Sequence, residues 1–535
     1  MFDLIEKRLQ AIRLHGDASL LCNSTIGLEK ESLRVASSGG MADTPHPGAW
    51  GSALTHPWLT TDYSEALTEF VTPPCDNAAE ALDYLADLQS YAYSRLDDEM
   101  LWATSMPCVL AGDENIPIAR YGDSNLGQMK HVYRVGLGHR YGRVMQVIAG
   151  VHFNWSLPES FWPMYRKLES ASGTDEQMRD TEYMGLVRNI QRIGWIIPYL
   201  FGASPSVCKS FFAEGKSDLP LFDEHTYFEP HATSLRMGDI GYQNSKEEGL
   251  GIKACYDSVE DYAESLLDAI STPAELWQRI GVKVDGEYRQ LNANILQIEN
   301  EYYNSVRPKQ ILDGLESPAI ALHKRGIRYV ELRSLDVNAY HPLGVDETQL
   351  RFLEAFMLCC LLSESEVLSQ DEQAEVNENL LAVAHRGREP GLKLQRRGGQ
   401  VSLHEWGTQI LQSMLPICQL LDEQNGGMIY EDALDDQLTK MRHPDTTPSA
   451  RMLREMEDRG EGFYQFANRL SVQHHRYFSM RELNEERTAY FDKTVRDSHQ
   501  QQQAVEQDDG ISFDQFLSDY FAGIIASRPP KRGAE

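Results

Sequence analysis

Four separated segments have the residue pattern of β-strands and carry acidic or metal-binding side chains. They are residues 26–31, 62–69, 146–154 and 329–333. Alternate residues of a strand share one face, with same-face neighbours about 6.5–7 Å apart. Glu29 therefore points with Glu31, His152 with Asn154, and Glu331 with Arg333. If the four strands belong to one sheet, one face carries carboxylates, an imidazole and a guanidinium.

Helical periodicity dominates elsewhere, most clearly after residue 345. The first fourteen residues, MFDLIEKRLQAIRL, predict an amphipathic helix, and Asn77 with Glu80 resembles a capping box that opens a helix through about Leu96. Further helices are predicted over 176–197, 346–366, 371–386, 403–424, 447–475, 479–496 and 511–526. Residues 289–303 predict a strand, 306–309 a loop, and the glutamine-rich 497–510 a loose surface connection.

This order of elements predicts an α+β protein. A sheet-bearing part covers residues 1–345, and a largely helical part covers 346–535. A chain of 535 residues is too long for one simple core, so two intimately packed parts are expected. No Gly/Ser linker separates them, and we therefore predict one continuous catalytic unit without an independent second domain.

The amino-acid composition limits which kinds of molecule this protein is expected to bind. With 41% hydrophobic and 24% charged residues, the chain is typical of a soluble globular protein. The net charge of −30 argues against nucleic acid, because phosphate binding needs clustered Lys and Arg. An anionic substrate would need arginines or metal ions at its site.

The compartment is predicted to be the cytoplasm. The N-terminus lacks the features of a signal peptide, and the longest apolar run, 355–362, is too short to span a membrane. None of the eight cysteines forms a CxxC pair, which argues against zinc ribbons and thioredoxin-like motifs. Reduced thiols are expected, with Cys359 and Cys360 as inert core residues.

Each acidic strand also has a plain structural interpretation. Half-exposed strands often carry pairs such as Glu29 and Glu31. Strict alternation places Asp62 and Glu69 on opposite faces of a strand, so both can line one site only if a bulge or loop intervenes. Glu65 lies on the same strand face as Glu69 and is an equally acidic candidate. Any sheet with one face packed on helices and the other face exposed to solvent would show the alternation of apolar and polar residues seen over 146–157.

Several details favour a binding site over these alternatives. Gly150 beside His152 permits a ligand to approach closely. Glu331 and Arg333 could form a surface ion pair, but a planar guanidinium can also grip an anion bidentately. One imidazole among carboxylates suits Mg²⁺ or Mn²⁺ better than structural zinc. No common glycine-rich nucleotide loop occurs, and the Gly- and Arg-rich 136–143 suggests a mobile substrate loop.

Several segments, in order along the chain, closely resemble the proteobacterial type of glutamate–cysteine ligase, also called γ-glutamylcysteine synthetase. They are GLEKESLRV, THPWLTTDYSEALTEFVTP, HVYRVGLGHRYGR, MQVIAGVHFNWS, ATSLRMGDIGYQN and GIRYVELRSLDVNAYHPLGV. The resemblance extends from about residue 5 to about residue 520. It implies a glutamine-synthetase-like curved antiparallel sheet that forms the floor of the active site, surrounded by helices.

The resemblance also implies an activity: ATP-dependent joining of the L-glutamate γ-carboxyl to the L-cysteine amine through a γ-glutamyl phosphate, the first step of glutathione biosynthesis. Catalysis is expected from Arg333 and Glu331. The residues expected to bind metal are Glu29, Glu31, Asp62, Glu69, His152 and Glu331. Those expected to bind glutamate or the phosphoryl group are Arg134, Asn154, Tyr303 and Arg333.

The cysteine pocket is expected to be formed by Tyr63, Tyr133, Leu137, Gln146, Arg236 and Tyr242. The family position of Tyr63 usually holds an aromatic residue, often Phe. Arg307 and Lys309 are candidates for ATP phosphate contact. The expected cofactor is Mg²⁺, with Mn²⁺ as the alternative and ATP as co-substrate. A cytoplasmic monomer with feedback inhibition by glutathione, and without nucleic-acid or membrane partners, completes the prediction.

Three other functions compete with this one. A ligase of the same fold could use another amine, as glutamine synthetase uses ammonia. A carboxylate-bridged metallohydrolase would act without ATP, and a catalytically dead relative would serve as an interaction protein. The intact set of acidic and basic residues argues against the last. No ATP-grasp domain follows residue 520, so a separate enzyme is expected for the second step of glutathione synthesis.

Overall fold

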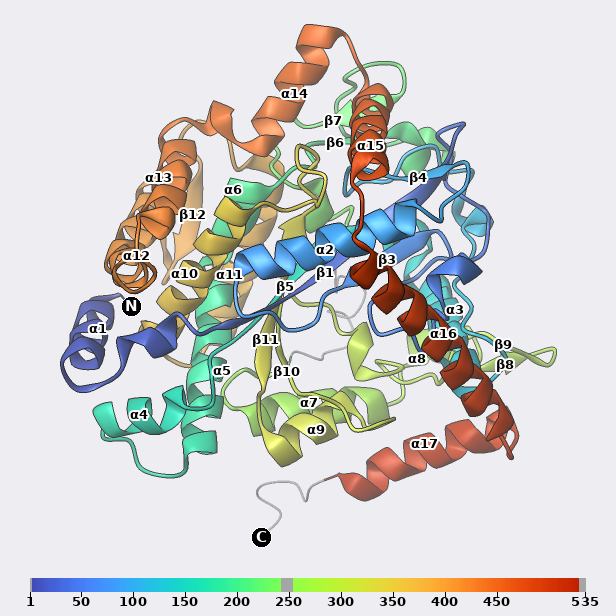
Figure 1. The fold of residues 1–535 in the computed structure, drawn as a ribbon, viewed down its shortest axis with the longest axis horizontal. Helices are drawn as coiled ribbons and strands as arrows, with labels where there is room; N and C mark the ends of the chain where they lie inside the picture. The colour runs from blue at the N-terminus through green and yellow to red at the C-terminus, as the bar shows by residue number, and fades with distance from the viewer. Residues whose placement is uncertain (1, 242–253, 529–535) are drawn as a thin grey trace.

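A seven-stranded antiparallel sheet forms the centre of the protein (Figure 1). The computed structural model describes residues 2–241 and 254–528. Six strands follow the order β10-β11-β5-β1-β3-β2, and β4 pairs separately with β1. Their bounds are β1 Thr25–Ala36, β2 Leu59–Thr61, β3 Leu67–Val71, β4 Glu99–Leu101, β5 Gly150–Ser156, β10 Val306–Lys309 and β11 Tyr329–Asp336. The predicted α+β fold with an antiparallel sheet is confirmed.

The four acidic segments lie on four neighbouring strands. In the register of the sheet Glu31 lies opposite Glu69, and Glu29 lies opposite His152. Glu331 lies opposite Asn154 on the other side of β5. A row of polar side chains therefore crosses the sheet from β3 to β11, which alternation within each strand could not establish by itself.

Helices surround the sheet. Their bounds are α1 Asp3–His15, α2 Ala78–Tyr93, α3 Asn125–Tyr141, α4 Phe161–Leu168, α5 Asp175–Ile193, α6 Ile196–Phe201, α7 Val259–Ser271, α8 Glu275–Gln278, α9 Pro318–Arg325, α10 Glu347–Leu362, α11 Gln370–Arg386, α12 Leu403–Asn425, α13 Ile429–Arg442, α14 Pro448–Arg459, α15 Phe463–Met480, α16 Glu485–Gln507 and α17 Phe513–Ser527. The residues that the structure describes also form three two-stranded sheets: β6 Ser206–Cys208 with β7 Thr226–Phe228, β8 Lys283–Val284 with β9 Glu287–Tyr288, and β12 Lys393–Arg396 with β13 Gly399–Ser402.

The apolar face of the sheet packs on helices, which leaves the acidic face for the site. Val151, Phe153 and Trp155 of β5 are completely buried. Trp155 meets Tyr183 of α5 edge to face at 6.4 Å. Lys30, between the two glutamates of β1, points the other way and donates to Gln89 of α2 at 2.7 Å. The alternation predicted for β1 and β5 therefore separates the core from the site.

The helical part after residue 345 packs on the same core. Residues of α10, α12 and α13 belong to one buried hydrophobic cluster with residues of β1, β5 and α2. The amphipathic N-terminal helix is confirmed as α1, with Ile5, Leu9 and Ile12 buried. This shared core supports one continuous unit, which remains our proposal for the domain organisation.

Several predicted elements are wrong at points where local pattern and tertiary context disagree. Residues 62–72 are not one strand, because the turn 62–66 joins β2 to β3. The predicted loop 306–309 is strand β10, which tolerates Pro308 because it lies at the edge of the sheet. The predicted strand 289–303 contains only the 3-10 turn Glu299–Glu301 as regular structure.

The helical part also differs in detail. Residues 497–510 are not a loose connection, because α16 continues to Gln507; glutamine is a good helix former. The helix predicted over 447–475 is divided at Gly460, which adopts a left-handed conformation. The prediction missed α13 altogether. Asn77 caps α2 as expected, whereas Glu80 accepts from the N–H of Asp76 rather than from that of Asn77.

The cysteines follow the prediction only in part. Cys359 and Cys360 are buried in α10, as expected of core residues. Cys108 and Cys208 form a disulfide, so the expectation of reduced thiols is wrong for this pair. Among residues 2–241 and 254–528, none of the helices combines the length and the hydropathy needed to cross a membrane.

Candidate active site

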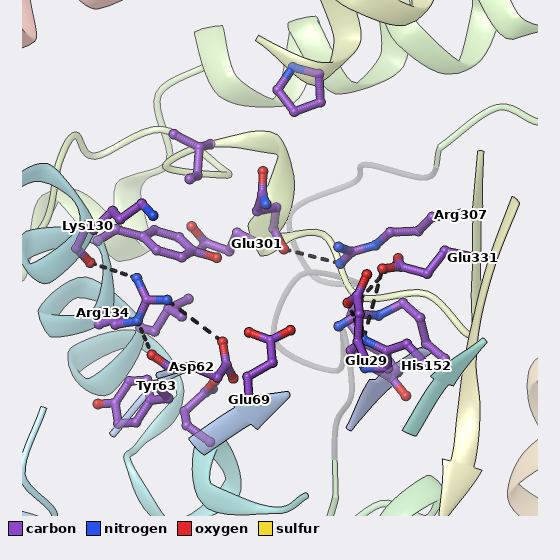
Figure 2. A pocket seen from close by; sticks show the side chains of 18 of the residues that line it. Glu29, Asp62, Tyr63, Glu69, Lys130, Arg134, His152, Glu301, Arg307 and Glu331 are labelled. Atoms are coloured by element: carbon purple, nitrogen blue, oxygen red, sulfur yellow. Dashed lines mark hydrogen bonds and ion pairs between the residues drawn. The ribbon is translucent and has the colours of Figure 1, made fainter. Parts of the chain in front are cut away.

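A cavity of about 450 Å³ opens above the acidic face of the sheet (Figure 2). Its walls come from the strands β1, β3, β5, β10 and β11, from α3, and from the segment that precedes α9. The predicted residues that line it are Glu29, Glu31, Asp62, Tyr63, Glu69, Tyr133, Arg134, Leu137, Gln146, His152, Arg236, Tyr303, Arg307, Lys309, Glu331 and Arg333. Asn154 lies just behind this wall, and Tyr242 lies outside the described residues.

Glu29, His152 and Glu331 form the first group of ligand-type atoms. One ligand-type atom from each of them lies within 4.8 Å of the other two. His152 Nδ1 is 3.0 Å from Glu29 Oε2 and 3.9 Å from Glu331 Oε1. Asn154 donates to the other Glu29 oxygen at 2.9 Å, which fixes the carboxylate from behind. The three side chains therefore already converge as metal ligands would.

Glu31, Asp62 and Glu69 form a second, purely acidic group. Burial, followed by the charges of Glu29, Asp62 and Glu31, raises the pKa of Glu69 well above its usual value. Burial, with a further contribution from Asp62, also raises the pKa of Glu31. Glu69 and Glu31 are directly opposed on neighbouring strands, where like charges destabilise a sheet. A bound cation would relieve this repulsion.

The turn between β2 and β3 explains how Asp62 and Glu69 reach one cavity. The N–H of Asp62 donates to the carbonyl of Leu67 at 2.9 Å, which closes the turn and brings Asp62 back over the end of β3. The loop that the sequence required is therefore present. The competitor Glu65 points elsewhere and accepts from the N–H groups of His46 and Arg120 at 2.7 and 2.8 Å.

Basic side chains neutralise Glu331, which is only 1% exposed. Arg333 Nη1 is 3.1 Å from one of its oxygens, and Lys309 Nζ is 3.3 Å from the other. Burial opposes ionisation, but the charges of Lys309 and Arg333 outweigh it and hold the pKa of Glu331 well below its usual value. The pKa of Arg333 is raised, since Glu331 and Glu29 overcome the effect of its burial.

One face of α3 forms a second wall, opposite β11 in Figure 2. Lys130, Tyr133, Arg134 and Leu137 line the cavity at helical spacing. The expected mobile loop over 136–143 is therefore wrong: its first six residues complete α3. Its glycines serve packing, because a Cβ on Gly136 would lie 2.1 Å from the amide oxygen of Gln297.

Lys130 and Glu301 are cavity residues that the sequence prediction missed. Burial, and then the charge of Arg134, lowers the pKa of Lys130 to about 8. The position of Lys130 one helical turn before Arg134 is a signal that could have found it. Glu301 pairs with the buried Arg140 at 2.7 Å and comes from the segment wrongly predicted as a strand, so no periodic signal pointed to it.

Arg236 reaches the cavity beside the start of β5 and the strand β11. Its guanidinium donates to the carbonyl of Arg333 at 2.9 Å and is 3.8 Å from Asp336. A Cβ on Gly150 would lie 2.1 Å from Arg236 Nη2. The space left by Gly150, which we expected a ligand to use, is therefore taken by the Arg236 side chain.

Tyr63 is 1% exposed, and its hydroxyl has no hydrogen-bond partner among the described residues. We expect Tyr63→Phe to leave the KM for the amine substrate within about twofold, and to leave the free energy of unfolding unchanged or raise it by about 1 kcal/mol, because a buried unpaired hydroxyl carries a desolvation penalty. Urea unfolding and steady-state kinetics test this.

Tyr121→Phe is the matched control for Tyr63→Phe. The Tyr121 hydroxyl is also buried, but it donates to the carbonyls of Thr61 and Asp62 at 2.7 and 2.8 Å. Its removal should lower the free energy of unfolding by about 1–2 kcal/mol. A larger kinetic defect for Tyr63→Phe than for Tyr121→Phe would mean that the Tyr63 hydroxyl contacts substrate.

The fold and the site define an enzyme of the class that the resemblance indicates: a ligase built on a glutamine-synthetase-like sheet, with carboxylates on one face and arginines beside them. The glutamate–cysteine ligase family model matches residues 9–383. The chain is 46% identical to glutamate–cysteine ligase from Pseudomonas aeruginosa over 98% of this chain and 99% of the relative. The Alcanivorax borkumensis enzyme is 44% identical over 97% and 99% of the two chains. The chain therefore belongs to the glutamate–cysteine ligase family.

A solved structure agrees with this assignment. The crystal structure of glutamate–cysteine ligase from Francisella tularensis in complex with AMP has a TM-score of 0.88 and 32% identity, covering 95% of this chain and 99% of that one. A bifunctional glutathione synthetase from Pasteurella multocida shares the fold, with a TM-score of 0.72 and 22% identity over 92% of this chain and 58% of its own.

Proposed function

We propose that the protein joins the γ-carboxyl of L-glutamate to the amine of L-cysteine at the described cavity, with ATP as the phosphoryl donor. The observation that supports this most is the convergence of two acidic groups and Arg333 on one cavity floor. A carboxylate is a poor electrophile, and phosphorylation turns it into an acyl phosphate that an amine can attack. This chemistry depends on positioning and on neutralising charge, which are the properties the site offers.

The chain's own residues fit Mg²⁺ at two places. Glu29, His152 and Glu331 converge with the donor set of one site. The repulsion that raises the pKa of Glu69, which Arg333 offsets only in part, fits a second cation beside Glu31, Asp62 and Glu69. When bound, Mg²⁺ would neutralise phosphate oxygens and help to orient the two reacting anions. Mn²⁺ is the alternative, because one imidazole stands among the carboxylates.

Arg333 is proposed to contact the transferring phosphoryl group. Its guanidinium lies between Glu331 and His152, 3.1 and 3.4 Å from their nearest atoms, and remains positively charged at every relevant pH. Fixed positive charge stabilises the oxygens of an in-line phosphoryl transfer without reorganising during the step. Arg134, Asn154 and Tyr303 are proposed to orient glutamate beside it.

The nucleotide is proposed to enter along β10. Arg307 and Lys309 of this strand line the cavity, and Lys309 lies 3.3 Å from Glu331. Beyond them the rim is apolar, with Leu312 and Leu315 both more than one-third exposed. Phosphates beside Lys309 and an adenine against this rim would bring the γ-phosphoryl group towards Arg333.

Cysteine is proposed to bind between α3 and the segment that carries Arg236. The residues assigned to this pocket are Tyr63, Tyr133, Leu137, Gln146 and Arg236, with Tyr242 proposed from the sequence alone. The Arg236 guanidinium would bind the cysteine carboxylate, which leaves the amine free to attack the acyl phosphate.

Measuring ADP release tests the proposed function. Glutamate with cysteine should support rapid, Mg²⁺-dependent ADP release, whereas glutamate with ammonia should support far less. EDTA should abolish turnover, and excess Mg²⁺ should restore it. Equal or greater turnover with ammonia would assign the protein to a different amine, and peptide hydrolysis without ATP would indicate a metallohydrolase.

We expect Gly150→Ala to raise the KM for cysteine about tenfold or more, because the added Cβ would lie 2.1 Å from the Arg236 guanidinium and displace it. The KM for ATP should change less than twofold. Steady-state kinetics with each substrate varied in turn measure this. An unchanged cysteine KM together with a correctly folded variant would contradict the assignment of Arg236.

The remaining partners follow from the same pocket. Glutathione contains the γ-glutamylcysteine unit, so it should compete with glutamate as a feedback inhibitor. We propose that the enzyme works as a monomer in the cytoplasm, because the residues assigned to the site come from a single chain. Sedimentation of the enzyme at micromolar concentration tests the oligomeric state.

A further inference from the structure

Arg236 is held by a turn outside the central sheet. The turn comprises the 3-10 helix Leu235–Met237 and continues through Gly238 and Asp239 to Gly241. Arg236 itself is only 2% exposed, so its path into the cavity is narrow. The location of its guanidinium therefore depends on what fixes this turn.

The C-terminal end of α11 fixes the start of the turn. The N–H groups of Thr233 and Ser234 donate to the carbonyl of Ala384 at 2.9 and 3.2 Å. The Thr233 hydroxyl donates to the carbonyl of Val383 at 2.9 Å. These bonds join the turn to α11, although α11 contributes no residue to the lining of the cavity among the described residues.

His385, the next residue of α11, bridges both sides of the turn. Its Nδ1 lies 2.6 Å from a carboxylate oxygen of Glu229, before Arg236, and its Nε2 lies 3.0 Å from Asp239, after Arg236. Gly238 allows this approach, since a Cβ there would lie 2.5 Å from Nε2. One imidazole ring thus links the two ends of the segment that carries Arg236.

The charge of the ring determines the strength of this bridge. Burial disfavours the imidazolium, but the hydrogen bond and charge of Glu229, followed by the charge of Asp239, outweigh burial and raise the pKa of His385. The arginines that follow His385 in the chain are engaged elsewhere: Arg386 pairs with Glu389 at 2.5 Å, and Arg388 donates to the carbonyls of Pro230 and Ala232. The ring therefore faces two carboxylates, and in its neutral form Nε2 can accept only the backbone N–H of Asp239 at 3.3 Å.

We propose that His385 is a positioning residue for the amine substrate, because its bridge between Glu229 and Asp239 holds the turn that keeps Arg236 in the cavity. This inference rests on the proposed role of Arg236 in binding cysteine. A histidine whose pKa is higher in the folded than in the unfolded protein stabilises the folded state fully at pH values below its unfolded-state pKa. This stabilisation is lost as the pH rises through its folded-state pKa. The bridge is therefore complete in weakly acidic solution and weakens in alkaline solution.

The test compares the wild-type enzyme with His385→Gln between pH 6 and pH 9. At pH 6 the variant should have a KM for cysteine about tenfold higher, with kcat and the KM for ATP changed less than twofold. As the pH rises, the ratio of the two cysteine KM values should fall towards one, because the wild-type ring loses its proton. The protonation of the cysteine substrate affects both KM values equally at a given pH, so it does not change their ratio.

Three further variants separate the outcomes. Asp239→Asn should reproduce the effect at pH 6, and His404→Gln, an exposed histidine at the start of α12, should change nothing. A ratio of one at pH 6, or an elevated ratio that stays constant with pH, would overturn the proposed bridge. If Arg236→Lys leaves the cysteine KM unchanged, the proposed function of Arg236 fails as well; if it raises that KM while His385→Gln does not, only the positioning role fails.

Discussion

Arg333→Ala should lower kcat by about 10³-fold or more, while the free energy of unfolding falls by only about 1–3 kcal/mol. An arginine at a transferring phosphoryl group supplies fixed positive charge there, which Arg307 and Lys309, proposed for the other ATP phosphates, do not replace. The structural loss is smaller because Lys309 still neutralises Glu331 at 3.3 Å. ADP release and urea unfolding, measured on the same preparation, give the two quantities.

Two variants sharpen this prediction. Arg328→Ala removes an arginine next to β11 that pairs with Glu159 and does not line the cavity, so it should leave turnover nearly unchanged. Adding Glu331→Gln to Arg333→Ala should recover part of the lost stability, since Glu331 is then no longer a buried charge with Lys309 as its remaining partner, but it should not recover turnover. A cooperative loss of the fold that fully accounts for the loss of activity would refute the role of Arg333.

Glu69→Gln should make the metal-free enzyme more stable and at the same time nearly inactive. In the absence of cations, Glu69 faces Glu31 across the β1–β3 pair and adds to the charge of Asp62. Removing this charge should raise the free energy of unfolding by about 1 kcal/mol. Turnover should fall by about 10²-fold or more, because a proposed ligand for the metal is lost.

Metal and pH both distinguish this variant from the wild-type enzyme. Saturating Mg²⁺ should stabilise the wild type by about 2.7 kcal/mol at a hundredfold excess over Kd, and Glu69→Gln by much less. Folding raises the pKa of Glu69, so metal-free wild type should lose stability as pH rises above about 4.5, and the variant should lose less. Glu287→Gln, on the exposed β8–β9 hairpin, is the control. If Mg²⁺ raised the free energy of unfolding of the wild type and of Glu69→Gln by the same amount, Glu69 would not be a metal ligand.

The gathering of polar side chains on the cavity floor was largely predictable from sequence, because it depends on residue type and on period-two spacing. Glu29 with Glu31 and Glu331 with Arg333 share a face through strand geometry alone, and the apolar alternation of β5 separates core from cavity. The family resemblance added residues such as Arg134 and Arg236 that no periodicity could connect with those strands.

Local pattern failed where long-range contacts determine the conformation. The glycines of α3 suggested a loop, yet that segment is helical, and Gly136 gives room for the side chain of Gln297. Pro308 suggested a loop, yet β10 is an edge strand and tolerates the missing N–H. Glu301 was missed for a related reason: it becomes a cavity residue only through the packing of segments distant in sequence.

The polar face of each strand, the residue types that could bind cations and anions, and the family all follow from the order of the amino acids. The folded structure was needed to show that β3, β1, β5 and β11 are neighbours, that a turn brings Asp62 over Glu69, and that His385 of α11 contacts both ends of the turn carrying Arg236. The reason is physical: periodicity records how a residue points from its own backbone, whereas the order of strands depends on contacts between residues tens of positions to well over a hundred positions apart.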